Sequence, residues 1–206
     1  MEGLDGSGTT TQAGLLKEWF AGEGKSYGRC VATFEPTAGP AGSLARMALN
    51  HRLHLDKRTL ALLFAADRTD HVFKKAEGSQ EPGILHYLEQ GVHVISDRYI
   101  LSSLAYQSVD LPVEWILQIN CQVILPDLTI YIDLDPAIAQ DRLDQGRSHK
   151  DLFESLEAQN KIRGHYQEGI SLLQEKGHKI VTIDGNRPAE VVSADILKEI
   201  TPFLAL

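Results

Sequence analysis

Short apolar runs alternate with amphipathic segments along most of the chain, and this alternation constrains the fold more than any other feature. Runs rich in β-branched and aromatic residues predict strands at residues 30–34, 92–96, 128–134 and 179–183. The segments between them carry apolar residues at helical spacing. Strands that alternate with helices indicate a doubly wound parallel sheet with helices on both faces, because each parallel pair needs a crossover connection.

The intervening segments predict helices over residues 10–21, 43–49, 57–75, 82–90, 152–176 and 188–204, with another that starts at Pro136. The chain has no repeat, low-complexity segment or linker, so we expect residues 1–206 to form one domain. The charged stretch 144–151 interrupts the helical pattern. It predicts a lid spanning residues 142–154 approximately, although a solvated loop accounts for the same composition.

The charge balance of the chain excludes some classes of partner. Its 206 residues include 20 Lys and Arg against 28 Asp and Glu, a formal net charge of −8. We therefore expect no nucleic-acid or anionic-membrane partner, because both require positive faces. No apolar run is long enough to span a membrane, and no signal-peptide pattern is present. Cys30 and Cys121 lie far apart without a CxxC pattern, which favours a reducing, cytoplasmic location.

A glycine-rich segment at residues 3–10, GLDGSGTT, comes close to the Walker A phosphate-binding pattern. Its glycines let the backbone turn so that N–H groups face an anion. A helix that begins near Thr9 directs its positive end toward the same point. Thr10 occupies the position whose hydroxyl ligates Mg²⁺ in this pattern. Thr9 stands where the pattern has lysine, so a simple glycine-rich turn is the alternative interpretation.

The position of this loop in the chain is unusual. Only Met1 and Glu2 precede it, whereas a phosphate-binding loop ordinarily follows a buried strand of about five residues. We therefore expect the first strand to be missing or truncated. In doubly wound nucleotide-binding folds this strand is central, so we expect its loss to destabilise the sheet.

Three further segments carry a family resemblance: residues 64–68 (FAADR), residues 97–107 (DRYILSSLAYQ) and residues 126–129 (PDLT). With the glycine-rich loop, their order and spacing resemble the thymidylate kinases over nearly the whole chain, and residues 97–107 are the most specific part. The resemblance implies a P-loop nucleoside monophosphate kinase fold. It also implies phosphoryl transfer from ATP to dTMP, which makes dTDP for dTTP synthesis, with Mg²⁺, a flexible lid and a homodimer.

The same resemblance implies two sets of binding residues. Those expected to bind ATP phosphates are Gly3, Leu4, Asp5, Gly6, Ser7, Gly8, Thr9, Thr10 and Thr11. Those expected to bind dTMP are Glu35, Arg46, Phe64, Arg68, Arg98, Ser103, Tyr106 and Gln107.

Several of these residues have a definite chemical role in the implied site. Phe64 is expected to stack on the base, and Arg68, one helical turn later, to donate to a thymine carbonyl. Tyr106 is expected to pack beneath the sugar and leave no room for a 2′-hydroxyl. Without the resemblance, Phe64 is interpreted as a core aromatic and Arg68 as part of a surface ion pair.

Asp97 and Arg98 follow the strand at residues 92–96, at the carboxyl edge where doubly wound sheets place their sites. Arg98 is expected to bind phosphate through its planar set of donors, and Asp97 to hold Mg²⁺ together with Thr10. A local ion pair is the alternative interpretation of these neighbours. We expect catalysis to depend on Asp5, Arg98 and Arg147, the last of these in the lid.

The lysine absent from the loop normally supplies positive charge to the transferring phosphoryl group. In one account a lid base, Arg142, Arg147 or Lys150, replaces it and the enzyme is active. We favour this account because the implied dTMP-binding residues are nearly all present. In a second account the chain binds nucleotides with weak or no kinase activity. A third is a deoxynucleoside kinase that acts on thymidine itself.

Overall fold

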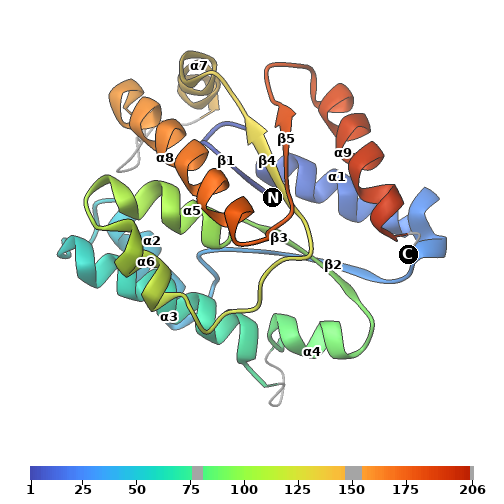
Figure 1. Cartoon of the computed structure of the whole chain (residues 1–206), viewed down its shortest axis with the longest axis horizontal. Coiled ribbons are helices and arrows are strands. Elements are labelled where there is room, and N and C mark those ends of the chain that lie inside the picture. The colour runs from blue at the N-terminus through green and yellow to red at the C-terminus, as the bar shows by residue number, and fades with distance from the viewer. Residues whose placement is uncertain (76–80, 147–154, 205–206) are drawn as a thin grey trace.

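The computed structural model describes residues 1–75, 81–146 and 155–204 (Figure 1). Parallel strands form its centre. β2 (Cys30–Phe34) pairs with β3 (His93–Asp97), while β4 (Thr129–Asp133) pairs with β1 (Glu2–Gly3) on one side and β5 (Ile180–Asp184) on the other. The strands predicted from sequence are confirmed to within one residue at each end, and the parallel α/β fold class is confirmed with them.

Of the two expectations for the first strand, missing or truncated, the structure has the second, because β1 is present but only two residues long. β1 pairs with β4 along both of its residues. On the opposite side, the amino group of Met1 donates to Ser96 O at 2.8 Å, and Arg98 N donates to Met1 O at 2.8 Å. β1 therefore links the two groups of strands into one parallel sheet of order β2-β3-β1-β4-β5 and lies at its centre.

Helices cover both faces of this sheet. α1 (Thr9–Ala21) and α9 (Ala189–Leu204) pack on one face, and α3 (Lys57–Phe73), α5 (Ile100–Tyr106) and α8 (Leu156–Glu175) pack on the other. The remaining helical elements are η1 (Glu23–Tyr27), α2 (Pro40–Leu49), α4 (Ile84–Glu89), η2 (Gln107–Val109), α6 (Val113–Ile119) and α7 (Pro136–Gly146). Among the described residues, no helix has the length and hydropathy needed to cross a bilayer.

Two helices, α5 and α6, lie in a stretch where the hydrophobic pattern predicts no element. All seven residues of α5 are buried. A helix that is buried all round has no polar face, so its sequence lacks the period that identifies a surface helix. This helix positions the candidate site, because it begins directly after β3.

Candidate active site

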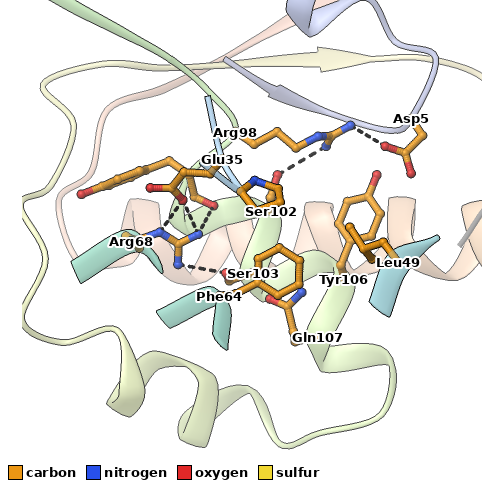
Figure 2. A pocket seen from close by; sticks show the side chains of 12 residues that line it. Asp5, Glu35, Leu49, Phe64, Arg68, Arg98, Ser102, Ser103, Tyr106 and Gln107 are labelled. Atoms are coloured by element: carbon orange, nitrogen blue, oxygen red, sulfur yellow. Dashed lines mark hydrogen bonds and ion pairs between the residues drawn. The ribbon is translucent and has the colours of Figure 1, made fainter. Parts of the chain in front are cut away.

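The candidate site lies at the carboxyl ends of β1, β2 and β3. Asp5 follows β1, Glu35 follows β2 and Arg98 follows β3, so segments far apart in the sequence meet at one edge of the sheet. They line a cavity of about 120 Å³ together with side chains from α2, α3 and α5 (Figure 2). The other lining residues are Pro36, Leu49, Phe64, Arg68, Tyr99, Ser102, Ser103, Tyr106 and Gln107.

Arg98 forms the end of the cavity nearest the glycine-rich loop. Its Nη2 donates to Asp5 Oδ1 at 2.7 Å, and its Nη1 donates to Gly3 O at 2.5 Å and to Tyr166 OH at 3.1 Å. Its backbone φ of 69° is in the left-handed region that non-glycine residues rarely adopt. Burial opposes its charge, but Tyr106, Asp5 and other neighbours raise the pKa of Arg98. Arg98 is therefore a permanent cation between loop and cavity, and its ion pair is with Asp5.

Arg68 forms the opposite end and is only 2% exposed, so it is not part of a surface ion pair. Its Nε and Nη2 lie 2.8 Å and 2.7 Å from Glu35 Oε2. Its Nη1 donates to Ser103 Oγ at 2.9 Å and to Asn120 Oδ1 at 2.5 Å, while Nη2 also donates to Tyr99 O at 3.0 Å. All five donors of the guanidinium are thus engaged, and a ligand carbonyl must replace one of these acceptors to bond with Arg68.

His71 and Asn120 complete this network and are absent from the residues predicted from sequence. His71 Nδ1 lies 2.9 Å from Glu35 Oε1, and its Nε2 lies 2.6 Å from Thr33 Oγ1. His71 follows Arg68 by three residues on α3, which places both side chains on one helix face, and this spacing is a signal that sequence reasoning can use. Asn120 follows α6 and offers no comparable signal.

Between the two arginines, the cavity is lined by an aromatic pair and an amide. Phe64 and Tyr106 both face this space (Figure 2). The Arg98 guanidinium carbon lies 5.3 Å from the centre of the Tyr106 ring, and burial raises the pKa of Tyr106, so its phenol is neutral. Gln107 Oε1 is buried and has no hydrogen-bond partner among the residues described. A ligand that donates a hydrogen bond here satisfies this oxygen.

One residue of the predicted dTMP set, Arg46, does not line the cavity. It lies on α2, where its Nη1 donates to Pro36 O at 2.5 Å and its Nη2 to Ser43 Oγ at 3.4 Å. Pro36 itself lines the cavity. Arg46 therefore contacts a residue that lines the cavity but does not line the cavity itself.

The glycine-rich loop has the geometry of an anion cradle. Gly6 and Gly8 have φ of 84° and 91°, which glycine adopts without strain. Ser7 N donates to Leu4 O at 3.0 Å and closes the turn before α1. Because α1 begins at Thr9, its unpaired N-terminal N–H groups adjoin the loop. Thr9, at the position of the absent lysine, is only 4% exposed.

Thr10 and Asp97, the two residues predicted to hold Mg²⁺ together, are adjacent in the structure. Thr10 Oγ1 donates to Asp97 Oδ2 at 2.5 Å, and Asp97 Oδ1 is buried with no hydrogen-bond partner in the described part of the chain. Hydroxyl and carboxylate oxygens suit Mg²⁺, which keeps several waters or phosphate oxygens as further ligands. Within the described ranges, no group of three or more His, Cys, Asp or Glu residues is placed to hold a metal by itself. The donor set therefore fits an ion that is also bound to phosphate.

Of the lid bases, the described residues include Arg142. Its Nη1 lies 3.4 Å from Gly6 O, and its Nη2 donates to Gly185 O at 3.1 Å, so α7 places a cation beside the glycine-rich loop. Arg147 and Lys150, with the rest of residues 147–154, lie outside the described residues.

Comparison with known proteins identifies relatives over most of the chain. The family model for thymidylate kinase matches residues 1–196. A probable thymidylate kinase from Pyrococcus abyssi is 41% identical over 182 residues, which cover 85% of this chain and 83% of that protein. Another probable thymidylate kinase, from Pyrobaculum aerophilum, is 37% identical over 197 residues, which cover 95% of this chain and 92% of that protein. A thymidylate kinase from Clavibacter sepedonicus is 36% identical over 202 residues, which cover 95% of this chain and 90% of that protein.

Proposed function

Because this chain belongs to the thymidylate kinase family and is therefore a nucleotide-phosphorylating enzyme, we propose that it transfers the γ-phosphoryl group of ATP to dTMP with Mg²⁺. One observation carries the proposal. A single cavity has a buried arginine network at one end and, at the other, a second arginine bonded to a phosphate-binding loop. A nucleoside monophosphate has the same polarity, with a base at one end and a phosphate at the other.

The Arg68 end suits a pyrimidine base. Phe64 offers a face for stacking, which contributes about 1–3 kcal/mol per base. Arg68 can direct Nη1 to a base carbonyl in place of Ser103, since Asn120 keeps the guanidinium in position. Gln107 Oε1 needs a donor, and N3–H of thymine is one. Tyr106 closes the cavity where the sugar lies, which supports selection of deoxyribose by exclusion.

The Arg98 end suits the reaction. Phosphoryl transfer needs alignment and positive charge rather than covalent chemistry from the protein. Arg98 presents a planar fork to the dTMP phosphate, and Asp5 orients that fork through the 2.7 Å bond. The glycine-rich loop binds the ATP phosphates through its backbone N–H groups. When Mg²⁺ is bound, held by Thr10 and Asp97, it neutralises charge on the phosphate oxygens.

A coupled assay of ADP release tests the proposal. We expect turnover with dTMP, and little with CMP, AMP or thymidine. Equal rates with CMP and dTMP contradict the pyrimidine assignment. Faster turnover with thymidine than with dTMP indicates a deoxynucleoside kinase instead.

Thr9 favours a second candidate function, a nucleotide-binding protein with weak or no kinase activity. The residue is buried and uncharged where the loop pattern has lysine. This candidate predicts calorimetric binding of dTMP without turnover, even at high enzyme concentration.

We favour activity because Arg142 places a positive charge beside the loop. Replacing Arg142 by alanine is expected to lower kcat by about 100-fold, as loss of one charge-stabilising donor does, with little change in dTMP affinity. Arg142→Lys keeps the charge and serves as the matched control. Adding Thr9→Lys to Arg142→Ala is expected to restore most of the activity. If Thr9→Lys alone raises kcat by orders of magnitude, Arg142 does not compensate for the missing lysine.

The proposal includes a homodimer and a cytoplasmic location. Leu44 and Met47 on α2 and Leu62 on α3 are apolar yet 42–49% exposed, which supports burial of these helices against a second copy. Light scattering is expected to give twice the chain mass of 22.8 kDa, and a monomer at assay concentration contradicts this. Cys30 and Cys121 are free thiols, which fits a reducing compartment.

A further inference from the structure

The two carboxylate oxygens of Glu35 are held by different residues of α3. Oε2 faces Arg68, whose Nε and Nη2 lie 2.8 Å and 2.7 Å away. Oε1 lies 2.9 Å from His71 Nδ1, and His71 is the one hydrogen-bond donor to this oxygen among the residues described. A carboxylate accepts but does not donate, so Nδ1 carries the proton of this bond. Arg68 and His71 together therefore fix the orientation of the carboxylate.

The His71 ring is itself held through its other nitrogen. Nε2 lies 2.6 Å from Thr33 Oγ1 on β2. The ladder of β2 continues to Glu35, whose N–H donates to Asp97 O at 3.0 Å, so Thr33 and Glu35 share one face of the strand. The ring bridges these two side chains, and the His71 side chain is only 9% exposed. His71 does not line the cavity, so its effect on a ligand passes through Glu35.

In this arrangement the acceptors around Arg68 are turned toward its guanidinium. Figure 2 shows Arg68 bonded to Glu35 on one side and to Ser103 on the other. The four acceptors are Glu35 Oε2, Ser103 Oγ, Asn120 Oδ1 and Tyr99 O. A guanidinium donates hydrogen bonds and cannot accept one. This end of the cavity therefore suits a ligand atom that accepts, such as a keto oxygen.

Gln107, the polar group between the two arginines, does not by itself select a keto base. Its unpartnered Oε1 can accept from the N3–H of thymine. Rotation of the amide exchanges its oxygen and nitrogen, however, and then presents an N–H to the unprotonated N3 of cytosine. The guanidinium has no such second state. The choice between a keto and an amino base therefore depends on Arg68 and on where the Glu35 carboxylate points.

We propose that His71 is a positioning residue that selects a keto base, because it keeps Glu35 Oε1 from turning into the cavity. Glu35 lines the cavity, so without the bond from His71 this oxygen can accept from the exocyclic amino group of cytosine. With His71 in place, that amino group meets the N–H donors of Arg68, and unpaired buried donors are strongly unfavourable. The inference rests on the proposed function, since it concerns the base of the nucleotide bound in the same cavity.

Calorimetric titration with dTMP and 5-methyl-dCMP tests this role, because the bases of these nucleotides differ only in the 4-oxo or 4-amino group and the N3 proton. Three variants are compared with the unsubstituted protein. His71→Leu removes both hydrogen bonds of the ring. His71→Asn places an amide where Nδ1 lies and keeps the bond to Glu35. His71→Gln is the matched control, since its amide reaches the position of Nε2 and keeps only the bond to Thr33.

We expect the unsubstituted protein to bind dTMP about 100-fold or more tightly than 5-methyl-dCMP. In His71→Leu and His71→Gln the two Kd values are expected to lie within about tenfold of each other, while His71→Asn restores most of the difference. A loss of folding stability weakens binding of both nucleotides alike, so the ratio of the Kd values reports positioning rather than folding. An unchanged ratio in His71→Leu, or equal ratios in His71→Asn and His71→Gln, overturns the proposal.

A measurement without nucleotide separates this inference from the proposed function. In NMR spectra, Arg68 Nε–H, which donates to Glu35, is expected to exchange with water about tenfold faster in His71→Leu and His71→Gln than in His71→Asn or the unsubstituted protein. The signal is identified by its loss in Arg68→Met. If the unsubstituted protein binds neither nucleotide, the proposed function fails, and this exchange rate still decides whether His71 positions Glu35. Equal exchange in His71→Asn and His71→Gln contradicts that positioning.

Discussion

Replacing Arg98 by methionine is expected to lower kcat for dTMP phosphorylation by about 10³-fold or more, an effect of the size seen when an arginine is removed from a phosphoryl-transfer site. Arg98 is bonded to Asp5 and Gly3 of the glycine-rich loop and lines the cavity that we propose binds dTMP. Among the residues that the structure describes, Arg98 is therefore the one cation that contacts the glycine-rich loop and also lines the cavity. Loss of its charge leaves the repulsion between two phosphates uncompensated during transfer, so kcat falls further than substrate affinity.

Arg98→Lys is the matched variant for this experiment. Lysine keeps the positive charge, and its backbone adopts the same left-handed conformation at position 98. It lacks the planar guanidinium donors of arginine. We expect an intermediate kcat and a Tm close to that of the methionine variant. If steady-state kinetics show kcat within about tenfold of the unsubstituted enzyme for Arg98→Met, then Arg98 does not act on the transferring group.

Replacing Arg68 by methionine is expected to act on both binding and stability. The dTMP KM is expected to rise by about 10- to 100-fold, the range for loss of one hydrogen bond to a charged group. The variant also leaves the Glu35 carboxylate, only 6% exposed, without its main partner. Breaking a buried pair in this way costs about 3–5 kcal/mol, which chemical denaturation measures directly.

A double variant separates these two effects. In Arg68→Met with Glu35→Leu no unpaired carboxylate is left, so we expect much of the lost stability to return. Because the proposed donor to the base is still absent, KM is expected to stay high. Recovery of KM together with stability shows that Arg68 acts only through the fold, and that it does not contact the base.

Much of the site could be anticipated from residues close together in the sequence. The strand at Cys30–Phe34, the loop glycines and the α3 face that carries Phe64 and Arg68 all follow from local spacing. α5 could not be anticipated in this way, because full burial removes its periodicity. The binding roles assigned to these residues are predictions that the variants above test.

The sequence by itself determined the alternation of strands and helices, the parallel class of the sheet and the position of the glycine-rich loop, because each depends on neighbours within a few positions. Only the tertiary structure decided which groups meet. Arg98 pairs with Asp5 across 93 residues, and Arg68 bonds to Asn120 across 52. It also decided that a two-residue strand joins the halves of the sheet. Contacts of this range depend on how whole elements pack, and residue spacing carries no record of that packing.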